Sequence, residues 1–287
     1  MPPVREGVLQ VKRDAAPIIL RRPFVGLART LVTPRVLELL RQHASVEKIL
    51  AAVPSFKPRD PQGPWGAFHA EMSNAYARIM DAAGRKARVR KAVERAGEIT
   101  VPTNPYSKKW IQGHASELAV ELSQRQHDTV RAIVQRGYGG GARPEDMAAQ
   151  LKRTVGLTAR QEESVQNFWL RAVDEDEDTA DARADRYAAQ SLTYRTENIA
   201  RTENKYAVEY GRQAEWLQSR DDGEISPDSK RTWVSSPSSD RLCEICEAMD
   251  GQVVGLDEPF VSDDGEEVDC PPLHPSCRCT CTIDIAT

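Results

Sequence analysis

The chain has 287 residues, of which 40% are hydrophobic and 29% are charged, and its formal net charge is −4. This composition allows a buried core and excludes an integral membrane protein, because no stretch approaches the roughly 20 apolar residues of a transmembrane helix. The first residues contain no apolar segment. We therefore expect that the chain carries no secretion signal and that it stays in a reducing compartment. In such a compartment, metal ligation by cysteine is favoured over disulfide formation.

The N-terminal part is predicted to contain an extended arm over residues 1–22 and a helix that begins at Thr33. Pro34 suits the first position of that helix. Apolar side chains then recur at helical spacing, at Val36, Leu37, Leu40, Ile49 and Leu50. The prolines between Val53 and Pro64 predict a break in the secondary structure.

The next two predicted helices span about Trp65–Ala96 and Ser107–Arg136. The first contains a dense basic cluster whose members recur at spacings of three and four residues and so project from one face, namely Arg85, Arg88, Lys91 and Arg95. This face is a candidate contact with DNA or with an acidic protein surface. The second helix has a stripe of side chains predicted to be buried, at Ile111, Leu118, Leu122, Thr129 and Ile133.

The glycine-rich run Gly137–Gly141 is interpreted as a connection between helices, with Gly137 as a helix C-cap. A phosphate-binding loop is disfavoured because no Lys-Ser/Thr pair follows and no apolar strand precedes it. Two shorter helices are predicted next, the second of which begins with a capping box formed by Thr158 and Gln161. The acidic run Asp174–Asp178 is interpreted as the start of another helix rather than as a divalent-cation site.

That helix is predicted over about Thr179–Gln218, with an inward stripe at Leu192, Thr196, Ile199, Glu203, Tyr206, Tyr210 and Leu217. Glu203 is the unusual member, because a carboxylate on the apolar face of a helix requires a partner. An arginine from a neighbouring segment is the simplest partner. A catalytic acid is the alternative, but no second carboxylate or histidine at useful spacing supports it.

Residues 219–287 differ in character from the rest of the chain. The segments "RTWVSS", "GQVVGL" and "CTCTIDI" are typical of short strands separated by turns. We therefore predict a mainly α fold, an elongated helical body with a small C-terminal α+β module of zinc-knuckle type. The predicted divisions are an arm and helix over 1–60, a helical body over 61–218 and a cysteine-rich module over 219–287.

This module contains all six cysteines of the chain. "CEIC" provides Cys243 and Cys246 at the spacing of a zinc knuckle, and "HPSC" provides His274 and Cys277, which together predict a tetrahedral structural zinc site. Cys279 is the alternative fourth ligand, because in an extended segment it lies on the same face as Cys277.

Two cysteines have less certain roles in this scheme. Cys281 is interpreted as a small buried hydrophobe, and Cys270 lies within reach of an ion at His274. Unligated or oxidised cysteines and a catalytic Cys–His pair are the competing interpretations. Ligand-like spacing and the surplus of thiols disfavour the catalytic pair.

The charges of the chain are divided unevenly. Residues 1–172 carry 28 Lys and Arg against 16 Asp and Glu, and residues 173–287 carry 11 against 27. The net charges of these two parts are therefore +12 and −16. A basic half of this kind is typical of contact with nucleic acid or with an acidic partner, although a solvated helix face would have the same composition.

Three separated segments, in this order, resemble the phage Mu F-like minor head proteins, also called phage head-morphogenesis proteins. They are "IARTE" at Ile199–Glu203, "KRTWVSSPSSDRLCEICEAMDGQVV" and "PPLHPSCRCT". The resemblance covers about residues 135–281 and includes the "GLTARQ" segment. By this resemblance, the family motif on the long helix consists of Arg201, Thr202 and Glu203. The family motif of the C-terminal module consists of Cys243, Cys246, His274, Cys277 and Cys279. Cys270 departs from the family pattern.

The resemblance implies a structural component of a tailed-phage virion without enzymatic activity. Its expected partners are the portal protein and the major capsid protein, with double-stranded DNA as a further candidate and neither a membrane nor a small-molecule substrate. The expected location is the capsid interior or portal vertex, and the host cytoplasm during assembly. The alternatives are a zinc-containing nucleic-acid-binding protein and a hydrolase centred on Glu203 or the cysteine cluster, the latter disfavoured by the lack of a convergent catalytic set.

Overall fold

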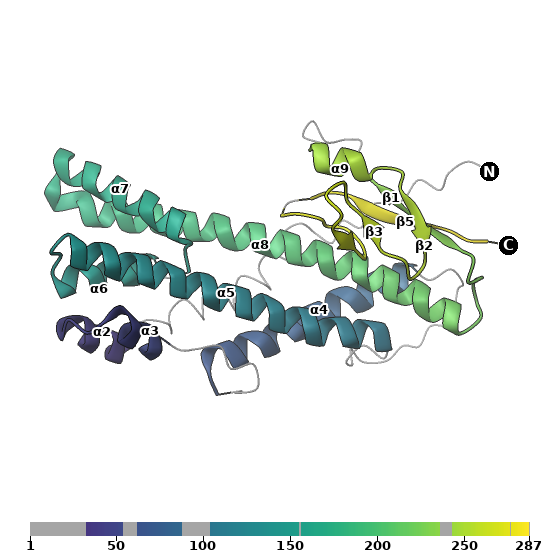
Figure 1. Cartoon of the computed structure of the whole chain (residues 1–287), viewed down its shortest axis with the longest axis horizontal. Helices are drawn as coiled ribbons and strands as arrows, with labels where there is room; N and C mark the ends of the chain where they lie inside the picture. Colours follow the sequence, from purple (N-terminus) through teal and green to yellow (C-terminus); the bar gives the residue numbers. More distant parts are fainter. Residues whose placement is uncertain are drawn as a thin grey trace.

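The computed structural model describes residues 33–53, 62–87, 104–154, 156–235, 243–275 and 277–286. Helices account for 69% of these residues, which confirms the predicted mainly α fold. Figure 1 shows a long bundle of helices with a small β-containing module on one end of α8. Among the described helices, none combines the length and the apolar character that a membrane span requires.

The first described helices are α2 (Pro34–Arg41), α3 (Val46–Ala52) and α4 (Pro64–Ala87). The predicted start is confirmed: the Thr33 hydroxyl caps α2 and accepts the Val36 N–H at 3.3 Å. The single predicted helix is instead divided in two. His43 adopts a φ of 47°, in the left-handed region, and Ser45 then caps α3, so the chain turns before its apolar face continues.

The predicted N-terminal arm, residues 1–22, lies outside the described residues, as do three members of the basic cluster, Arg88, Lys91 and Arg95. Arg85 belongs to the last turn of α4. The predicted continuation of this helix to Ala96 is therefore described only as far as Ala87.

Helices α5 (Pro105–Gly139) and α6 (Pro144–Thr154) are joined by the glycine-rich run. The prediction that Gly137 is a C-cap is wrong, because α5 continues to Gly139 and Gly140 is the cap. A Cβ at Gly137 would lie 2.4 Å from the Met147 sulfur, so this glycine permits the close approach of α6 to α5.

The hairpin formed by α7 (Ala159–Glu175) and α8 (Glu177–Asp221) occupies one end of the body. The predicted capping box of Thr158 and Gln161 is confirmed. Asp176 caps α8, which begins two residues before the predicted Thr179. With 45 residues and a rise of 1.5 Å per residue, α8 is about 68 Å long and connects the two ends of the molecule.

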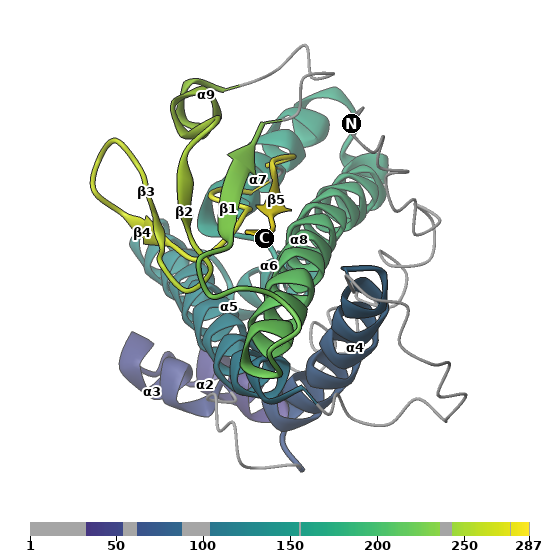
Figure 2. The same ribbon diagram turned by 90° about the vertical axis from the view of Figure 1, so that its right-hand side faces the viewer.

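Helices α4 and α5 flank α8, as Figure 2 shows in the view along the body. The crossing of α4 over α8 is close: a Cβ at Gly211 would lie 2.7 Å from the Met80 carbonyl oxygen. A larger residue would therefore meet backbone rather than a movable side chain. This crossing holds α8 within the core of the helical body, which we define as helices α2–α8.

The described part of the C-terminal module contains one helix and five short strands: β1 (Lys230–Val234), α9 (Glu244–Met249), β2 (Val253–Gly255), β3 (Phe260–Val261), β4 (Glu267–Val268) and β5 (Thr280–Asp284). The three predicted strands are confirmed as β1, β2 and β5, which form an antiparallel sheet with β1 in the centre. Strands β3 and β4 form a separate hairpin. Trp216 and Leu217 of α8 belong to the same apolar cluster as the module core, so the module packs directly on the long helix.

Candidate metal centre

The CxxC segment forms the first half of the centre through the N-terminus of α9. Cys243 is the N-cap, and its sulfur accepts the Cys246 N–H at 3.4 Å. Cys246, one turn later, faces the interior and is 3% exposed. Both sulfurs therefore belong to one tight turn, the arrangement that lets two thiolates reach one ion.

His274 lies between these two sulfurs. Its Nε2 is 3.1 Å from Cys243 Sγ and 3.0 Å from Cys246 Sγ. The other ring nitrogen, Nδ1, lies 2.9 Å from the Pro275 carbonyl oxygen, which can accept only from a protonated nitrogen. In the neutral imidazole this contact directs the Nε2 lone pair toward the thiols, as in metal-binding histidines whose second nitrogen is held by a carbonyl.

Cys277 and Cys279 form a second donor group, which shares Cys246 with the first. Cys277 Sγ lies 3.7 Å from Cys246 Sγ, and the sulfurs of Cys246, Cys277 and Cys279 lie within 4.8 Å of one another. A hydrogen bond from Cys279 lowers the pKa of Cys277, and the same bond raises the pKa of Cys279. The two thiols therefore have pKa values that are shifted in opposite directions.

Three of the donor separations can be compared with those of a tetrahedral zinc ion. Zn–S bonds of about 2.3 Å and Zn–N bonds of about 2.0 Å place sulfurs about 3.8 Å apart, and sulfur and nitrogen about 3.5 Å apart. The Cys246–Cys277 separation of 3.7 Å matches the first value. The two sulfur–nitrogen separations, 3.0 and 3.1 Å, are within about half an ångström of the second. These cysteine and histidine groups can therefore hold a metal ion.

The remaining cysteines lie in the apolar core of the module. Cys270 is 1% exposed and Cys281 is 2% exposed, and neither belongs to the donor groups found among the described residues. Burial raises the pKa of Cys281 to about 12 and also raises that of Cys270. Both therefore remain neutral thiols and contribute packing rather than ligation.

Arg231 joins three loops around the module core, a role the sequence analysis missed. Its side chain is fully buried and donates to the backbone carbonyls of Gly255, Glu258 and Asp269, while Phe260 lies 5.1 Å below the guanidinium. Strand alternation could have found this residue, because Arg231 and Trp233 are two positions apart and so share the buried face.

Glu209 of α8 connects the helical body to the module, and it too was missed. Its carboxylate is 1% exposed, and it accepts the Thr280 hydroxyl at 2.8 Å and the Cys281 N–H at 3.1 Å. Lys205 lies 2.7 Å from the same carboxylate and balances its charge. The edge strand that follows the metal-ligand candidates is therefore fastened to the long helix.

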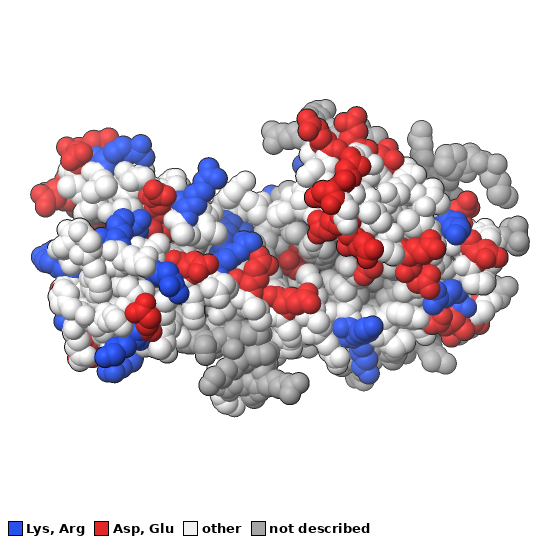
Figure 3. Space-filling model, in the orientation of Figure 1, with Lys and Arg blue, Asp and Glu red and all other residues white. Residues whose placement is uncertain are grey.

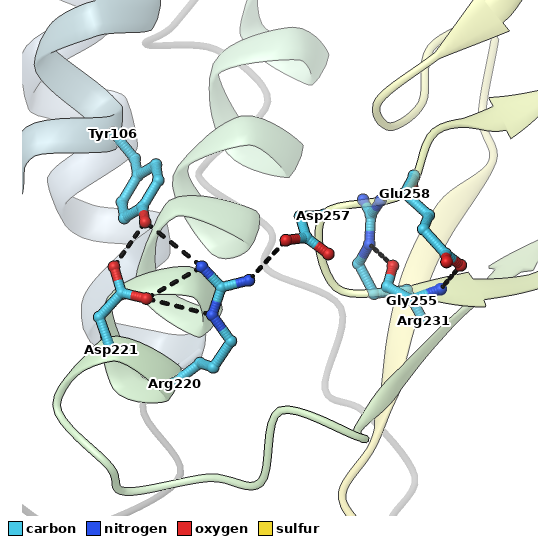
Figure 4. Close-up of polar contacts among 7 residues, drawn as sticks. All are labelled: Tyr106, Arg220, Asp221, Arg231, Gly255, Asp257 and Glu258. Atoms are coloured by element: carbon cyan, nitrogen blue, oxygen red, sulfur yellow. Dashed lines mark hydrogen bonds and ion pairs between the residues drawn. The ribbon is translucent and has the colours of Figure 1, made fainter.

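A second connection lies at the C-terminal end of α8 (Figure 4). Arg220 bonds to Asp221 at 2.9 Å and, across the junction, to Asp257 of the module at 3.0 Å. The Tyr106 hydroxyl of α5 donates to Asp221 at 2.5 Å, and this hydrogen bond raises the pKa of the tyrosine. Side chains from three segments distant in the sequence thus meet at one end of the body.

The motif on the long helix has one inward member. Glu203 is 5% exposed and accepts the Tyr76 hydroxyl at 2.5 Å, whereas Arg201 is largely exposed and Thr202 bonds its own helix at Asn198. The prediction of an arginine partner is wrong, because His114 Nε2 lies 2.7 Å from the same carboxylate. Helix α5 thus supplies the histidine that spacing along the chain could not indicate.

The fold and the site together define a mainly helical protein with a cysteine–histidine module of zinc-knuckle type. The chain belongs to the family described as phage Mu protein F like protein, whose model matches residues 128–282, more than half of the chain. This confirms the predicted resemblance and groups the chain with phage head-morphogenesis proteins. Comparison with curated proteins gave no match, and comparison with solved structures gave none either.

Proposed function

We propose that this protein is a structural component of a phage head, located at the portal vertex or capsid interior and bound to the portal protein and the major capsid protein. The observation that carries the proposal is the family match, which spans both α8 and the cysteine module. A helix about 68 Å long that joins a helical bundle to a compact module suits a protein that connects two partners.

The metal in this proposal is a structural zinc ion held by Cys243, Cys246, His274 and Cys277. The 3.7 Å separation of Cys277 Sγ from Cys246 Sγ supports its choice over Cys279, and so does the lowered pKa of Cys277, because the thiolate is the form that ligates. When bound, zinc would contribute folding free energy to the module rather than chemistry, because four protein ligands leave no open position for substrate.

The surroundings of Glu203 support a role without catalysis. Its carboxylate is buried and already bonded to Tyr76 and His114, which is the environment of a satisfied core carboxylate. We therefore propose that Glu203 holds α4, α5 and α8 together, and that the protein is not an enzyme.

The proposal is tested in particles produced from the phage genome that encodes this chain. Mass spectrometry of purified heads is expected to find the protein in few copies, and cryo-electron microscopy is expected to place it at the portal vertex. A genome with Cys246→Ser is expected to yield fewer complete heads than one with Cys281→Ala. Absence of the chain from purified heads would contradict the proposal.

Contact with double-stranded DNA is a further part of the proposal, based on the basic N-terminal half of the chain. Each phosphate neutralised steepens the log–log dependence of affinity on salt by about 0.9. Duplex binding by the full chain should therefore weaken between about 50 and 200 mM salt, and reversal of charge at Arg85, Arg88 and Arg95 should flatten that slope. Binding that does not change with salt would exclude a phosphate contact.

A further inference from the structure

A cavity of about 560 Å³ lies where the C-terminal module meets the helical body. Its lining comes from α5, from α8 and from the module between Pro259 and Leu273, so neither part of the molecule forms it alone. The volume is within the range of about 300–1,000 Å³ that is typical of ligand sites. None of the metal-ligand candidates lines the cavity, although its lining residue Leu273 directly precedes His274.

Carboxylates make up the charged lining of this cavity. Glu117 lies on α5, whereas Glu266, Glu267 and Asp269 lie on or beside β4, and no Lys or Arg belongs to the lining. Among the described residues, these four carboxylates make no ion pair. The buried Arg231 guanidinium donates to the backbone carbonyl of Asp269 rather than to its carboxylate. Figure 3 shows the acidic side chains gathered over the module and its junction with the body.

The floor of the cavity is aromatic, and this feature is independent of its charge. His114, Tyr206 and Tyr210 line it. Trp110 stacks behind them, with its ring centroid 4.3 Å from that of His114 and 4.8 Å from that of Tyr210. Because Glu203 holds His114 at 2.7 Å, the floor is fixed before any ligand arrives. Burial and the nearby Glu203 raise the pKa of Tyr206 to about 12, so its hydroxyl stays neutral.

We propose that this cavity is a docking site for an arginine-bearing segment of a partner protein. A guanidinium stacks on aromatic faces and forms paired hydrogen bonds with carboxylates, so its chemistry matches both the floor and the walls. Carboxylates from both the helical body and the module suit a segment with more than one basic side chain. DNA is excluded as the occupant because phosphates would be repelled. The identity of the partner rests on the proposed head-assembly role, whereas the docking site itself does not.

The test uses the full chain and a fluorescent peptide of alternating arginine and glycine, with binding followed by anisotropy. The double substitution Glu266→Gln with Glu267→Gln is expected to weaken binding about tenfold, the effect of two partly exposed charge pairs. The control is Asp228→Asn with Asp263→Asn, which removes the same charge from exposed positions outside the cavity lining. The control is expected to bind like the unmodified protein.

The aromatic floor is tested separately by Tyr206→Leu, which keeps an apolar side chain but removes the ring face. This variant is expected to lower affinity for the arginine peptide more than for a matched lysine peptide, because arginine stacks more effectively. Circular dichroism and metal content should remain unchanged in all of the variants, so that loss of binding reports the cavity rather than unfolding.

Two results would overturn the docking site. One is an equal loss of binding in the control and in the cavity variants, which would indicate non-specific attraction to an acidic surface. The other is displacement of the peptide by spermidine at equal concentration, which would indicate a site for small polycations. Neither result bears on the proposed head-assembly role, because that role is judged by the presence of the chain in purified heads.

Discussion

The helical body and the C-terminal module differ in what fills their cores. The largest core cluster of the body contains 24 buried apolar residues from helices α2–α6 and α8, none of them cysteine. The cluster of the module contains 12, of which five are cysteines. A thiol buries little apolar surface but binds zinc strongly as a thiolate. We therefore expect side-chain packing to stabilise the body, and metal ligation to contribute more to the stability of the module.

The largest expected difference between the two regions follows removal of the metal. A structural zinc site supplies on the order of 10 kcal/mol of apparent binding free energy, more than a small module can lose without unfolding. Chelation, or Cys246→Ser, should therefore expose the amides of β1 and β5 to hydrogen exchange and leave those of α5 protected. Cys281→Ala should keep one equivalent of zinc. Equal exchange in both regions would mean that they unfold as one unit.

The contact between α8 and the C-terminal module provides the next test of how the two regions differ. Glu209→Gln removes the charge that faces Lys205 and weakens the contacts with Thr280 and Cys281. Breaking a buried pair of this kind costs about 3 kcal/mol. Urea unfolding is expected to separate into two transitions, one for each region. The matched control is Glu197→Gln, on the same helix but partly exposed, which should leave a single transition.

A smaller effect, confined to the body, is expected for Glu203→Gln. The amide keeps the shape of the side chain but loses its charge, so the bonds with Tyr76 and His114 weaken. A hydrogen bond to a charged group contributes about 2 kcal/mol and one to a neutral group about 1 kcal/mol, so weakening both bonds should cost about 2 kcal/mol in total. Thermal unfolding of the body should occur at a lower temperature, while the zinc content is unchanged. An unchanged melting temperature would show that the buried carboxylate is not important for packing.

The smallest expected changes in stability come from replacing two glycines within long helices, and they are of opposite sign. Gly211→Ala forces a methyl group against the Met80 backbone and should destabilise the body by about 1–2 kcal/mol. Gly113→Ala is the same substitution at a position with nothing within 4 Å, so it should stabilise α5 by about 0.5–1 kcal/mol. Chemical denaturation measures both. Effects of equal sign would mean that helix propensity, rather than the close crossing, governs Gly211.

Several features were predictable because their causes are local. The capping box needs only Thr158 and Gln161, and the CxxC turn needs only the four residues around Cys243. Strand alternation placed Cys277, Cys279 and Cys281 on one buried side, as their low exposure shows. The division at residue 218 and the choice of the fourth ligand stay predictions, because they depend on how the segments assemble.

The sequence by itself determined the mainly α fold, the three sheet strands and the cysteine–histidine cluster, because periodicity and ligand spacing act over a few residues. Only the tertiary structure decided which side chains meet over long distances. Glu203 lies 127 residues from Tyr76 and 89 from His114, and the sequence indicated an arginine instead. Glu209 lies 71 residues from Thr280, and its role depends on the module being seated on α8. Such contacts depend on helix crossing and packing, which no local pattern encodes.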